Sequence, residues 1–367
     1  MTRVGIAILA GAGASMLIVG SASGQWIKLN NQTSSRLFAN PAYYTTDNLE
    51  KDFGIADFNQ DGWVDLIVMR KFYGSQTGGF TNILLMNEGG ILVDRTQEYA
   101  SSSDIVGYNG FFDLTNDRDV KMADFDQDGW LDFVTSTTMS DGLIDILGQP
   151  RVYMNLGNDG SGNWQGFLHV RDRMPHIFPM NNHATANPRF CDAAVGDLTG
   201  DGFADIFFVD YDTAETVGQT SCVDLNNDGD SSDPGECQTS PSETGSGIYS
   251  DFNNKLMVNW GNSGGPGPGY FYDSTTTILT STQLGSAFGN TVTINDMSGD
   301  GKNDIVRLST LGSPQNVAVL TKSNSGSTYL GPKTAVALNP YFHEAGDLNN
   351  DGKLDLVVAD DGVDRYL

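Results

Sequence analysis

Short apolar runs, rich in β-branched and aromatic residues, alternate with polar and glycine-rich stretches through most of the chain. Residues 82–100 read NILLMNEGGILVDRTQEYA, in which two apolar runs flank a glycine turn. Residues 151–172 and 255–276 repeat this arrangement around an Asn-x-Gly turn. None of these stretches has the apolar spacing that an amphipathic helix requires. The pattern therefore predicts short β-strands joined by hairpins, with almost no helix.

An acidic motif precedes these hairpins and is written five times. Its pattern is Asp-x-[Asp/Asn/Thr/Ser]-x-Asp-Gly-x-x-Asp, and an apolar run follows it. The copies occupy residues 57–68, 124–134, 197–208, 296–308 and 347–358. A fixed motif at uneven spacing indicates one supersecondary unit that is repeated with insertions in its loops. Each unit reads as a strand, the acidic loop, a second strand and a hairpin, so we predict an all-β fold, a β-propeller of four-stranded antiparallel blades.

The spacing of the acidic residues indicates a calcium-binding loop in each unit. Like-charged side chains at alternate positions 1, 3 and 5 repel one another unless a cation lies between them. A glycine at position 6 permits the backbone bend that turns these oxygens inward. Calcium takes about six to eight oxygen ligands, which side chains, one backbone carbonyl and a water can supply. We therefore expect about five calcium ions, each of which pins two adjacent strands.

The predicted ligands follow from the motif positions. In the first loop they are Asp57, Asn59, Asp61 and Asp65, with the carbonyl of Trp63. In the second they are Asp124, Asp126, Asp128 and Asp132, with the carbonyl of Trp130. In the third they are Asp197, Thr199, Asp201 and Asp205, with the carbonyl of Phe203. In the fourth they are Asp296, Ser298, Asp300 and Asp304, with the carbonyl of Lys302. In the fifth they are Asp347, Asn349, Asp351 and Asp355, with the carbonyl of Lys353.

The loops are not expected to bind equally. Thr199 and Ser298 place a neutral hydroxyl at position 3 and should weaken their sites, whereas the all-aspartate second loop should bind calcium most tightly. Two alternatives stay open, namely acidic hairpin turns without metal and magnesium in place of calcium. A sixth acidic stretch, with Asp224, Asn226, Asp228 and Asp230, lies in a polar insertion at 210–250 and lacks a following strand. It is a candidate for a further ion in a surface loop.

Charge and the N-terminus narrow the class of protein. The formal net charge of −26 argues against nucleic acid or an anionic membrane as partner, and favours bound cations.

Residues 1–24 have one basic residue, an apolar stretch and a small-residue end, which is the layout of a secretory signal peptide with cleavage before Gln25. An uncleaved membrane anchor is the less favoured interpretation, because the apolar stretch is short and rich in glycine. No later stretch is apolar enough to span a membrane, so we expect a secreted, cell-surface or periplasmic protein.

Three cysteines are present in a chain that we expect to meet an oxidising compartment. Cys222 and Cys237 bracket the sixth acidic stretch and could form a disulfide, which would leave Cys191 unpaired. Their pairing stays open at this point.

The motif and the hairpins resemble the FG-GAP/VCBS repeat family. The resemblance rests on the acidic loop that leads into a [Leu/Ile]-[Leu/Ile/Val]-Val strand, and on Asn-x-Gly hairpins followed by LVDRT or YFYDST. Such repeats form the propeller head of integrin α subunits and of many bacterial exported proteins. The resemblance covers residues 51–367 and leaves 25–50 as an N-terminal segment that could close the ring. It implies a calcium-binding scaffold for recognition or adhesion, with a protein or glycan ligand.

The fifth unit ends where earlier units enter their hairpin. Five units with a partial last one are fewer than the seven blades that are usual in this family, so we expect a chain that lacks the C-terminal part of its propeller. A third interpretation follows, in which the chain is a structural region of a larger surface protein.

A catalytic site is the alternative from a different functional class. His169, His176 and His183 are spaced seven apart in one stretch, as they would be in a metal or acid–base site of a polysaccharide lyase on a propeller scaffold. Pro175 and Pro179 prevent a continuous helix that would align them. We therefore favour a polar surface loop, and a chain that is not an enzyme. Loop aromatics, namely Tyr43, Tyr44, Tyr108, Phe111 and Phe112, could contact a ligand, but core packing is the favoured role.

Overall fold

The structure is a computed structural model that describes residues 30–40, 47–72, 78–138, 140, 145–177, 187–210, 220–222, 237–239, 254–280, 283, 291–309, 316–324, 328–337, 340–360 and 364–367. The predicted signal peptide 1–24 and the sixth acidic stretch lie outside these residues. Tyr43, Tyr44 and His183 also lie outside them.

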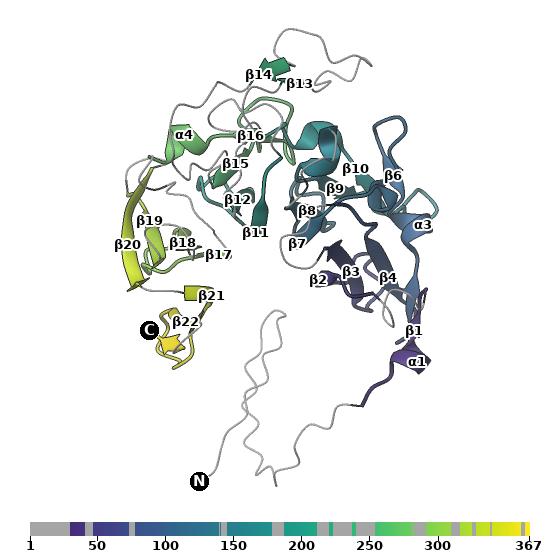
Figure 1. The fold of residues 1–367 in the computed structure, drawn as a ribbon, viewed down its shortest axis with the longest axis horizontal. Coiled ribbons are helices and arrows are strands. Elements are labelled where there is room, and N and C mark those ends of the chain that lie inside the picture. The colour runs from purple at the N-terminus through teal and green to yellow at the C-terminus, as the bar shows by residue number, and fades with distance from the viewer. Residues whose placement is uncertain are drawn as a thin grey trace.

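Five small, mostly antiparallel β-sheets, or blades, are arranged about a common centre as a β-propeller (Figure 1). The all-β fold predicted from the repeats is therefore confirmed. The blades follow one another in chain order, so the colour runs round the arc from purple in the first to yellow in the fifth. Strands are counted outward from the one nearest the centre, and in this order they follow the chain, except that β1 and β6 precede the other strands of their blades in the chain and lie outermost.

The first two blades have five strands each. The first has the order β1-β5-β4-β3-β2 and comprises β1 (Leu37–Phe38), β2 (Glu50–Ala56), β3 (Asp65–Lys71), β4 (Ile83–Asn87) and β5 (Leu92–Asp94). The second has the order β6-β10-β9-β8-β7 and comprises β6 (Ser102–Ser103), β7 (Asp117–Ala123), β8 (Asp132–Thr137), β9 (Val152–Asn155) and β10 (Phe167–His169). The short outermost strands β1 and β6 pair in parallel with β5 and β10.

The remaining blades have four or three strands. The third comprises β11 (Phe190–Gly196), β12 (Asp205–Asp210), β15 (Lys255–Asn259) and β16 (Phe271–Asp273). The fourth comprises β17 (Val292–Asn295), β18 (Asp304–Ser309), β19 (Asn316–Lys322) and β20 (Tyr329–Ala337). The fifth comprises β21 (Pro340–Gly346), β22 (Asp355–Asp360) and β23 (Arg365–Tyr366).

Two expectations about the flanking segments can be compared with the pairing. The strand of the N-terminal segment, β1, extends the first blade, and no pairing with the fifth blade is present among the described residues. In the insertion, β13 (Thr220–Cys222) and β14 (Cys237–Thr239) form a separate two-stranded sheet, in which Cys222 is the direct partner of Cys237. This register brings the two backbones together, and the disulfide between them stays a prediction. Cys191 is buried and has no disulfide partner.

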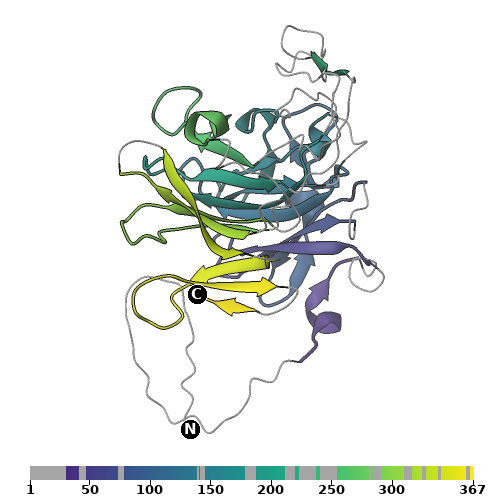
Figure 2. The ribbon, with the colours of Figure 1, turned by 60° about the vertical axis from the view of Figure 1, so that its left-hand side comes forward.

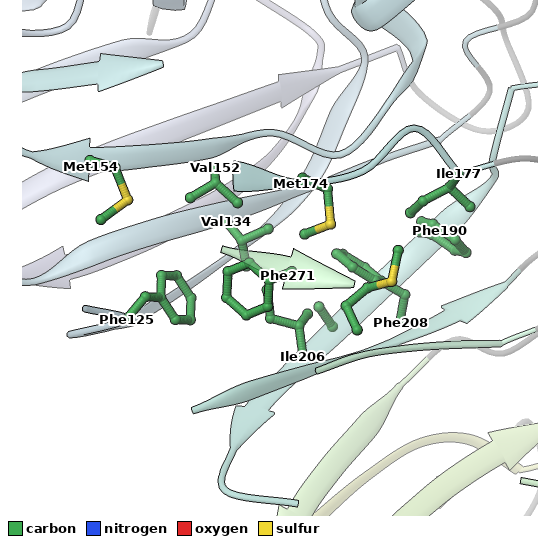
Figure 3. Packing of buried hydrophobic residues seen from close by; sticks show 12 residues of the cluster. Phe125, Val134, Val152, Met154, Met174, Ile177, Phe190, Ile206, Phe208 and Phe271 are labelled. Carbon is green, nitrogen blue, oxygen red and sulfur yellow. The ribbon is translucent and has the colours of Figure 1, made fainter. Parts of the chain in front are cut away.

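The hydrophobic core lies between adjacent blades. In the cluster between the second and third blades, Val134, Val152 and Met154 pack against Ile206, Phe208 and Met257 (Figure 3). Similar clusters join the first blade to the second, the third to the fourth and the fourth to the fifth. A middle blade therefore buries both of its faces. This explains why the second and third strands of a blade are continuous apolar runs and do not alternate with polar residues.

Helical structure is short and confined to connections. The α-helices are α1 (Thr33–Arg36), α3 (Thr96–Tyr99) and α4 (Thr275–Ile278), and the 3-10 turns are η1 (Gly110–Phe112), η2 (Asp145–Gly148) and η3 (Arg171–Arg173). In the part of the chain that the structure describes, no helix has the length and apolar character needed to cross a membrane.

The inner strands β2, β7, β11, β17 and β21 surround the centre of the propeller (Figure 1), and Figure 2 shows the same blades turned by 60°. Three aspartates on these strands join neighbouring blades. Asp52 accepts the backbone N–H of Val120 at 3.2 Å, Asp119 accepts that of Ala193 at 3.0 Å, and Asp192 accepts that of Val292 at 2.8 Å. Lys121 lies 2.9 Å from both Asp119 and Asp192. These bonds fix the angle between successive blades and hence the relative places of their loops.

Candidate metal centres at the acidic loops

Each acidic loop connects the first strand of its blade to the second, as the sequence predicted. The first loop follows β2 and ends at Asp65, the first residue of β3. The other four loops occupy the same place in their blades. Hydrogen bonds join the first loop to the second, the second to the third and the third to the fourth. The loops therefore lie side by side on one face of the propeller, which we call the loop face.

The aspartate at position 1 closes the loop in the same way in all five blades. Its two carboxylate oxygens accept the backbone N–H groups of positions 5 and 6 at 2.7–3.2 Å. The glycine at position 6 has a φ of 91°, 92°, 92°, 82° and 83° in the successive loops. Side chains rarely adopt this conformation, which accounts for the glycine in every copy.

The aspartate at position 5 shapes the second half of the loop. One of its carboxylate oxygens accepts the backbone N–H of position 7 at 2.8–3.1 Å in every blade. Positions 1 and 5 are thus held by the backbone of the loop itself. An ionised carboxylate offers about four acceptor positions, so each of these aspartates retains oxygen lone pairs that the loop does not use.

The second loop brings three carboxylates together. Oxygens of Asp124, Asp126 and Asp128 all lie within 4.8 Å of one another. Calcium binds its oxygens at about 2.3–2.6 Å, so ligands on opposite sides of one ion lie up to about 5 Å apart. One oxygen of Asp126, Oδ1, is buried and has no hydrogen-bond partner. Burial, followed by the charge of Asp128, raises the pKa of the Asp126 carboxyl, although Arg173, whose Nη2 lies 3.8 Å from Oδ2 of Asp126, acts to lower it. A divalent cation would satisfy this oxygen and cancel the repulsion, so the donor set fits calcium.

Position 3 differs among the other loops. Asn59 and Asn349 use their side-chain oxygen to accept the N–H of position 5, at 3.1 and 2.8 Å. Thr199 has a buried hydroxyl without a hydrogen-bond partner. Within the described residues, the second loop is the only one that assembles three carboxylates. The prediction that it binds calcium most tightly stays a prediction, and this geometry supports it.

The aspartate at position 9 holds the loop to the blade. Asp65, Asp132, Asp205 and Asp304 are at most 1% exposed. In the second blade, Oδ2 of Asp132 accepts the N–H of Phe125 at 3.0 Å, and Oδ1 accepts that of Asn155 at 2.8 Å. In the first, third and fourth blades the position 9 aspartate likewise accepts one N–H of the loop and one of the third strand, and in the fourth the loop N–H is that of Ser298 at position 3. In the fifth blade, Oδ2 of Asp355 accepts the N–H of Leu348 at 2.9 Å.

Asp132 is not part of the three-carboxylate group. Burial raises its pKa to about 8, against backbone hydrogen bonds that lower it. The same cause raises the pKa of Asp65 to about 6 and that of Asp205 to about 7. The structure thus gives position 9 a clear role as a latch between the loop and the third strand. Its predicted role as a metal ligand would use the lone pairs that remain.

The last residue of the third strand joins each loop to the blade that follows it. Asn155 donates from Nδ2 to the carbonyl of Phe58 at 2.9 Å, and Asn259 donates to that of Phe125 at 2.9 Å. Lys322 occupies the same place in the fourth blade and donates to the carbonyl of Leu198. These asparagines are the first residues of the Asn-x-Gly turns, where they also accept the N–H of the glycine. Each asparagine therefore holds both its own turn and the contact with the acidic loop of the preceding blade.

A glutamine at position 4 links neighbouring loops directly. Gln60 donates from Nε2 to the carbonyl of Gly129 at 2.7 Å, and Gln127 donates to that of Gly202 at 2.8 Å. Both glutamines have a positive φ, 58° and 60°, which aims the side chain along the loop face. Position 4 is glycine in the third and fourth loops, at Gly200 and Gly299, so this link joins only the first three loops.

Sequence reasoning missed the glutamine and asparagine contacts. The recurrence of glutamine at position 4, and of asparagine at the end of the third strand, was the available signal.

The histidine stretch also differs from the expected polar surface loop. His169 lies in β10 and is 2% exposed, and its Nδ1 lies 3.0 Å from Oγ of Ser103. Among the aromatics predicted to pack in the core, Phe111 is fully buried, whereas Phe112 is 36% exposed.

The fold and the loops define a β-propeller built from repeats with an acidic loop in each blade. The profile of the FG-GAP-like repeat matches residues 296–358, which contain the fourth and fifth loops and the strands between them. The resemblance to FG-GAP repeats is therefore confirmed, and the chain carries an FG-GAP-like repeat in a five-bladed propeller. A comparison with curated proteins gave no match.

Proposed function

We propose that this chain is an exported, calcium-stabilised β-propeller that acts as a recognition and adhesion scaffold for an extracellular protein or glycan. The FG-GAP-like repeat and the propeller fold support the coarser part of this proposal, a scaffold for recognition. Calcium, export and adhesion go beyond it. The observation that carries the calcium proposal is the convergence of Asp124, Asp126 and Asp128 around a buried oxygen that has no donor.

Calcium would be held by the oxygens at positions 1, 3 and 5 of each loop, with the carbonyl of position 7 and the aspartate of position 9. When bound, the ion supplies positive charge that offsets the repulsion within each loop. The chain itself sets the loop shape through backbone hydrogen bonds, and it passes that shape to the neighbouring blade through Asn155 and Asn259. The residues therefore arrange a site whose occupancy stabilises the contacts between blades.

Calorimetric titration of calcium into the chelator-treated chain tests this proposal. We expect about five ions per chain, with the tightest binding lost in Asp126→Ala. A matched control is Asp94→Ala, because Asp94 lies outside the acidic loops, on β5, and caps the turn at Thr96. No heat of binding in a folded chain would contradict the calcium proposal.

The proposal of export rests on the predicted signal peptide, residues 1–24, and has its own test. Protein sequencing of the mature chain should give Gln25 as the first residue after expression in a secreting host. Retention of residues 1–24 in a protein found inside the cell would contradict export without affecting the calcium proposal.

Recognition can be tested with an array of immobilised glycans and extracellular matrix proteins. We expect binding in calcium that chelator abolishes, because the ion offsets the repulsion within each loop and so stabilises the loop face. The enzyme alternative, which rested on His169, His176 and His183, stays a prediction. Loss of polysaccharide cleavage on replacing any of them with alanine would favour it over a binding scaffold.

A further inference from the structure

A cavity of about 330 Å³ lies at the end of the second blade that is opposite the loop face. The chain reaches this end where β9 begins and where β10 ends, because β8 and β10 both run away from the acidic loop. Gln149, Arg151, His169, Arg171 and His176 contribute to its wall. Its volume is at the lower end of the range for small-molecule sites. Because the cavity lies at the end of the blade away from the acidic loops, it is separate from the candidate metal centres.

Arg151 is the central group of this cavity and is 1% exposed. Its Nη1 donates to Oδ2 of Asp113 at 3.0 Å, to the carbonyl of Gly110 at 3.3 Å and to the hydroxyl of Tyr153 at 3.3 Å. Its Nε and Nη2 have no acceptor. These two atoms form one edge of the guanidinium, with two parallel N–H groups in the spacing that suits two oxygens of one anion. Leaving them without an acceptor costs free energy in a buried site.

Gln149 supplies a further donor in the same wall. Its Oε1 accepts the N–H of Ile177 at 2.9 Å, which fixes the orientation of the amide. Its Nε2 is buried and has no acceptor. Arg151 and Gln149, which both line the cavity, therefore carry three buried N–H-bearing atoms without acceptors, and other contacts hold both side chains in place.

The electrostatic field in the cavity is positive. Burial lowers the pKa of His169 well below its usual value, and the charges of Arg151 and Arg171 lower it further. Burial lowers the pKa of His176 to about 4, with the charge of Arg171 acting in the same direction. Asp172 also contributes to the wall and is exposed to solvent, whereas Asp113 occupies the opposite part of the guanidinium. No carboxylate among the described residues is bonded to the Nε–Nη2 edge.

The fold does not require a cation at this place. Arg151 immediately precedes β9, and its position relative to the second strand corresponds to that of Ile83 in the first blade and of Lys255 in the third. Ile83 is apolar and buried in its own blade, and Lys255 forms an ion pair with Asp273 at 3.2 Å. The second blade alone among these three has a buried guanidinium with an open edge at this position. Packing therefore does not account for Arg151.

We propose that this cavity binds an oxyanion, either a carboxylate or a tetrahedral sulfate-type group, on the Nε–Nη2 edge of Arg151 and Nε2 of Gln149. The site is separate from the loop face and does not rest on calcium. The bound group would be the acidic part of a small molecule or of a larger ligand, because the cavity is small and its donors are few.

Equilibrium dialysis of the full chain against labelled inorganic sulfate and labelled acetate, in calcium-containing buffer of constant ionic strength, tests this proposal. We expect one saturable site per chain for at least one of the two probes. Gln149→Glu keeps the oxygen that accepts from Ile177 and replaces the donor with a negative charge. Arg151→Lys keeps the charge near Asp113 and removes the fork. Each variant should weaken binding by about tenfold or more.

The control is Gln165→Glu, the same change in an exposed loop residue of the same blade, which should leave binding unchanged. Preference for acetate would identify carboxylates as the ligand class, and preference for sulfate would identify tetrahedral anions. Absence of saturable binding of both probes to the wild-type chain would overturn the proposal. Binding that survives in folded Gln149→Glu would also overturn it, so the test remains decisive even if Arg151→Lys fails to fold.

Discussion

The second and fourth acidic loops have the same backbone and different chemistry. In both, the position 1 aspartate accepts the N–H groups of positions 5 and 6, and a buried aspartate at position 9 latches the third strand. At position 3, however, the second loop has Asp126 where the fourth has Ser298. At position 4, the second loop has Gln127 where the fourth has Gly299. The second loop therefore has a carboxylate at position 3 and a glutamine that bonds to the next loop, whereas the fourth loop lacks both and is joined to the third loop through Asn303.

This difference separates the residues that set the loop shape from those that, in our proposal, set metal affinity. Positions 1, 5, 6 and 9 are enough to form the loop, because the fourth loop has these residues and forms it without a carboxylate at position 3. We propose that position 3 sets how strongly the loop binds a cation, and that glutamine at position 4 adds a link to the next loop. The residues at positions 1, 5, 6 and 9 are the same in all five loops, whereas those at positions 3 and 4 vary.

Removal of calcium should have the largest effect, because it acts on every loop at once. An ion present at 100 times its dissociation constant stabilises the folded state by about 2.7 kcal/mol per site. We expect a strong fall in melting temperature with chelator, reversed by added calcium and only weakly by magnesium. Calorimetric melts of the same preparation with and without chelator measure it. An unchanged melting temperature would contradict the proposal that calcium stabilises the propeller.

Asp132→Ala and Asp304→Ala should be the most damaging single substitutions, and they should be equally so. Each leaves two buried backbone N–H groups without an acceptor, at a cost of about 1–3 kcal/mol per group. Urea unfolding in calcium gives the free energy of unfolding. A large loss in one variant and none in the other would show that the two loops do not share their backbone arrangement.

Asp126→Ala should weaken calcium binding more than Ser298→Ala, by about tenfold or more, because only the former removes a charged ligand. The reverse change, Ser298→Asp, should strengthen the fourth loop. Terbium luminescence excited through tryptophan suits the second loop, since Trp130 stands at its position 7, whereas Lys302 stands there in the fourth. Calorimetry covers the fourth loop. Equal effects of Asp126→Ala and Ser298→Ala would refute the role assigned to position 3.

Gln127→Ala should have the smallest effect, a loss of about 0.5–1.5 kcal/mol for one hydrogen bond between the second and third loops. It should also make calcium binding at these loops less cooperative, while Gln97→Ala, at an exposed residue of α3, should change neither property. Stability and binding curves of the two variants provide the comparison. Identical curves would mean that the loops bind independently.

The parts of this molecule that sequence could predict are those that local chemistry determines. The acidic loops, their glycine at position 6 and the strands that follow depend on residues within one motif. The latch at position 9 depends on an N–H group of another strand, and the bonds of Gln60 and Asn155 depend on carbonyls of another blade, so only the packed structure reveals them. His169 was assigned to a surface loop because prolines follow it, yet its strand register with Tyr153 buries it. Arg151 gave no signal, since its role depends on groups that are far away in sequence.

Anomalous diffraction from crystals grown in calcium tests the central claim most directly. The account predicts an anomalous peak between the oxygens of Asp124, Asp126 and Asp128, at about 2.3–2.6 Å from its ligands, with weaker peaks in the loops that have a neutral residue at position 3. A well-ordered map that shows no peak at the second loop, with its three carboxylates turned toward solvent, would contradict it.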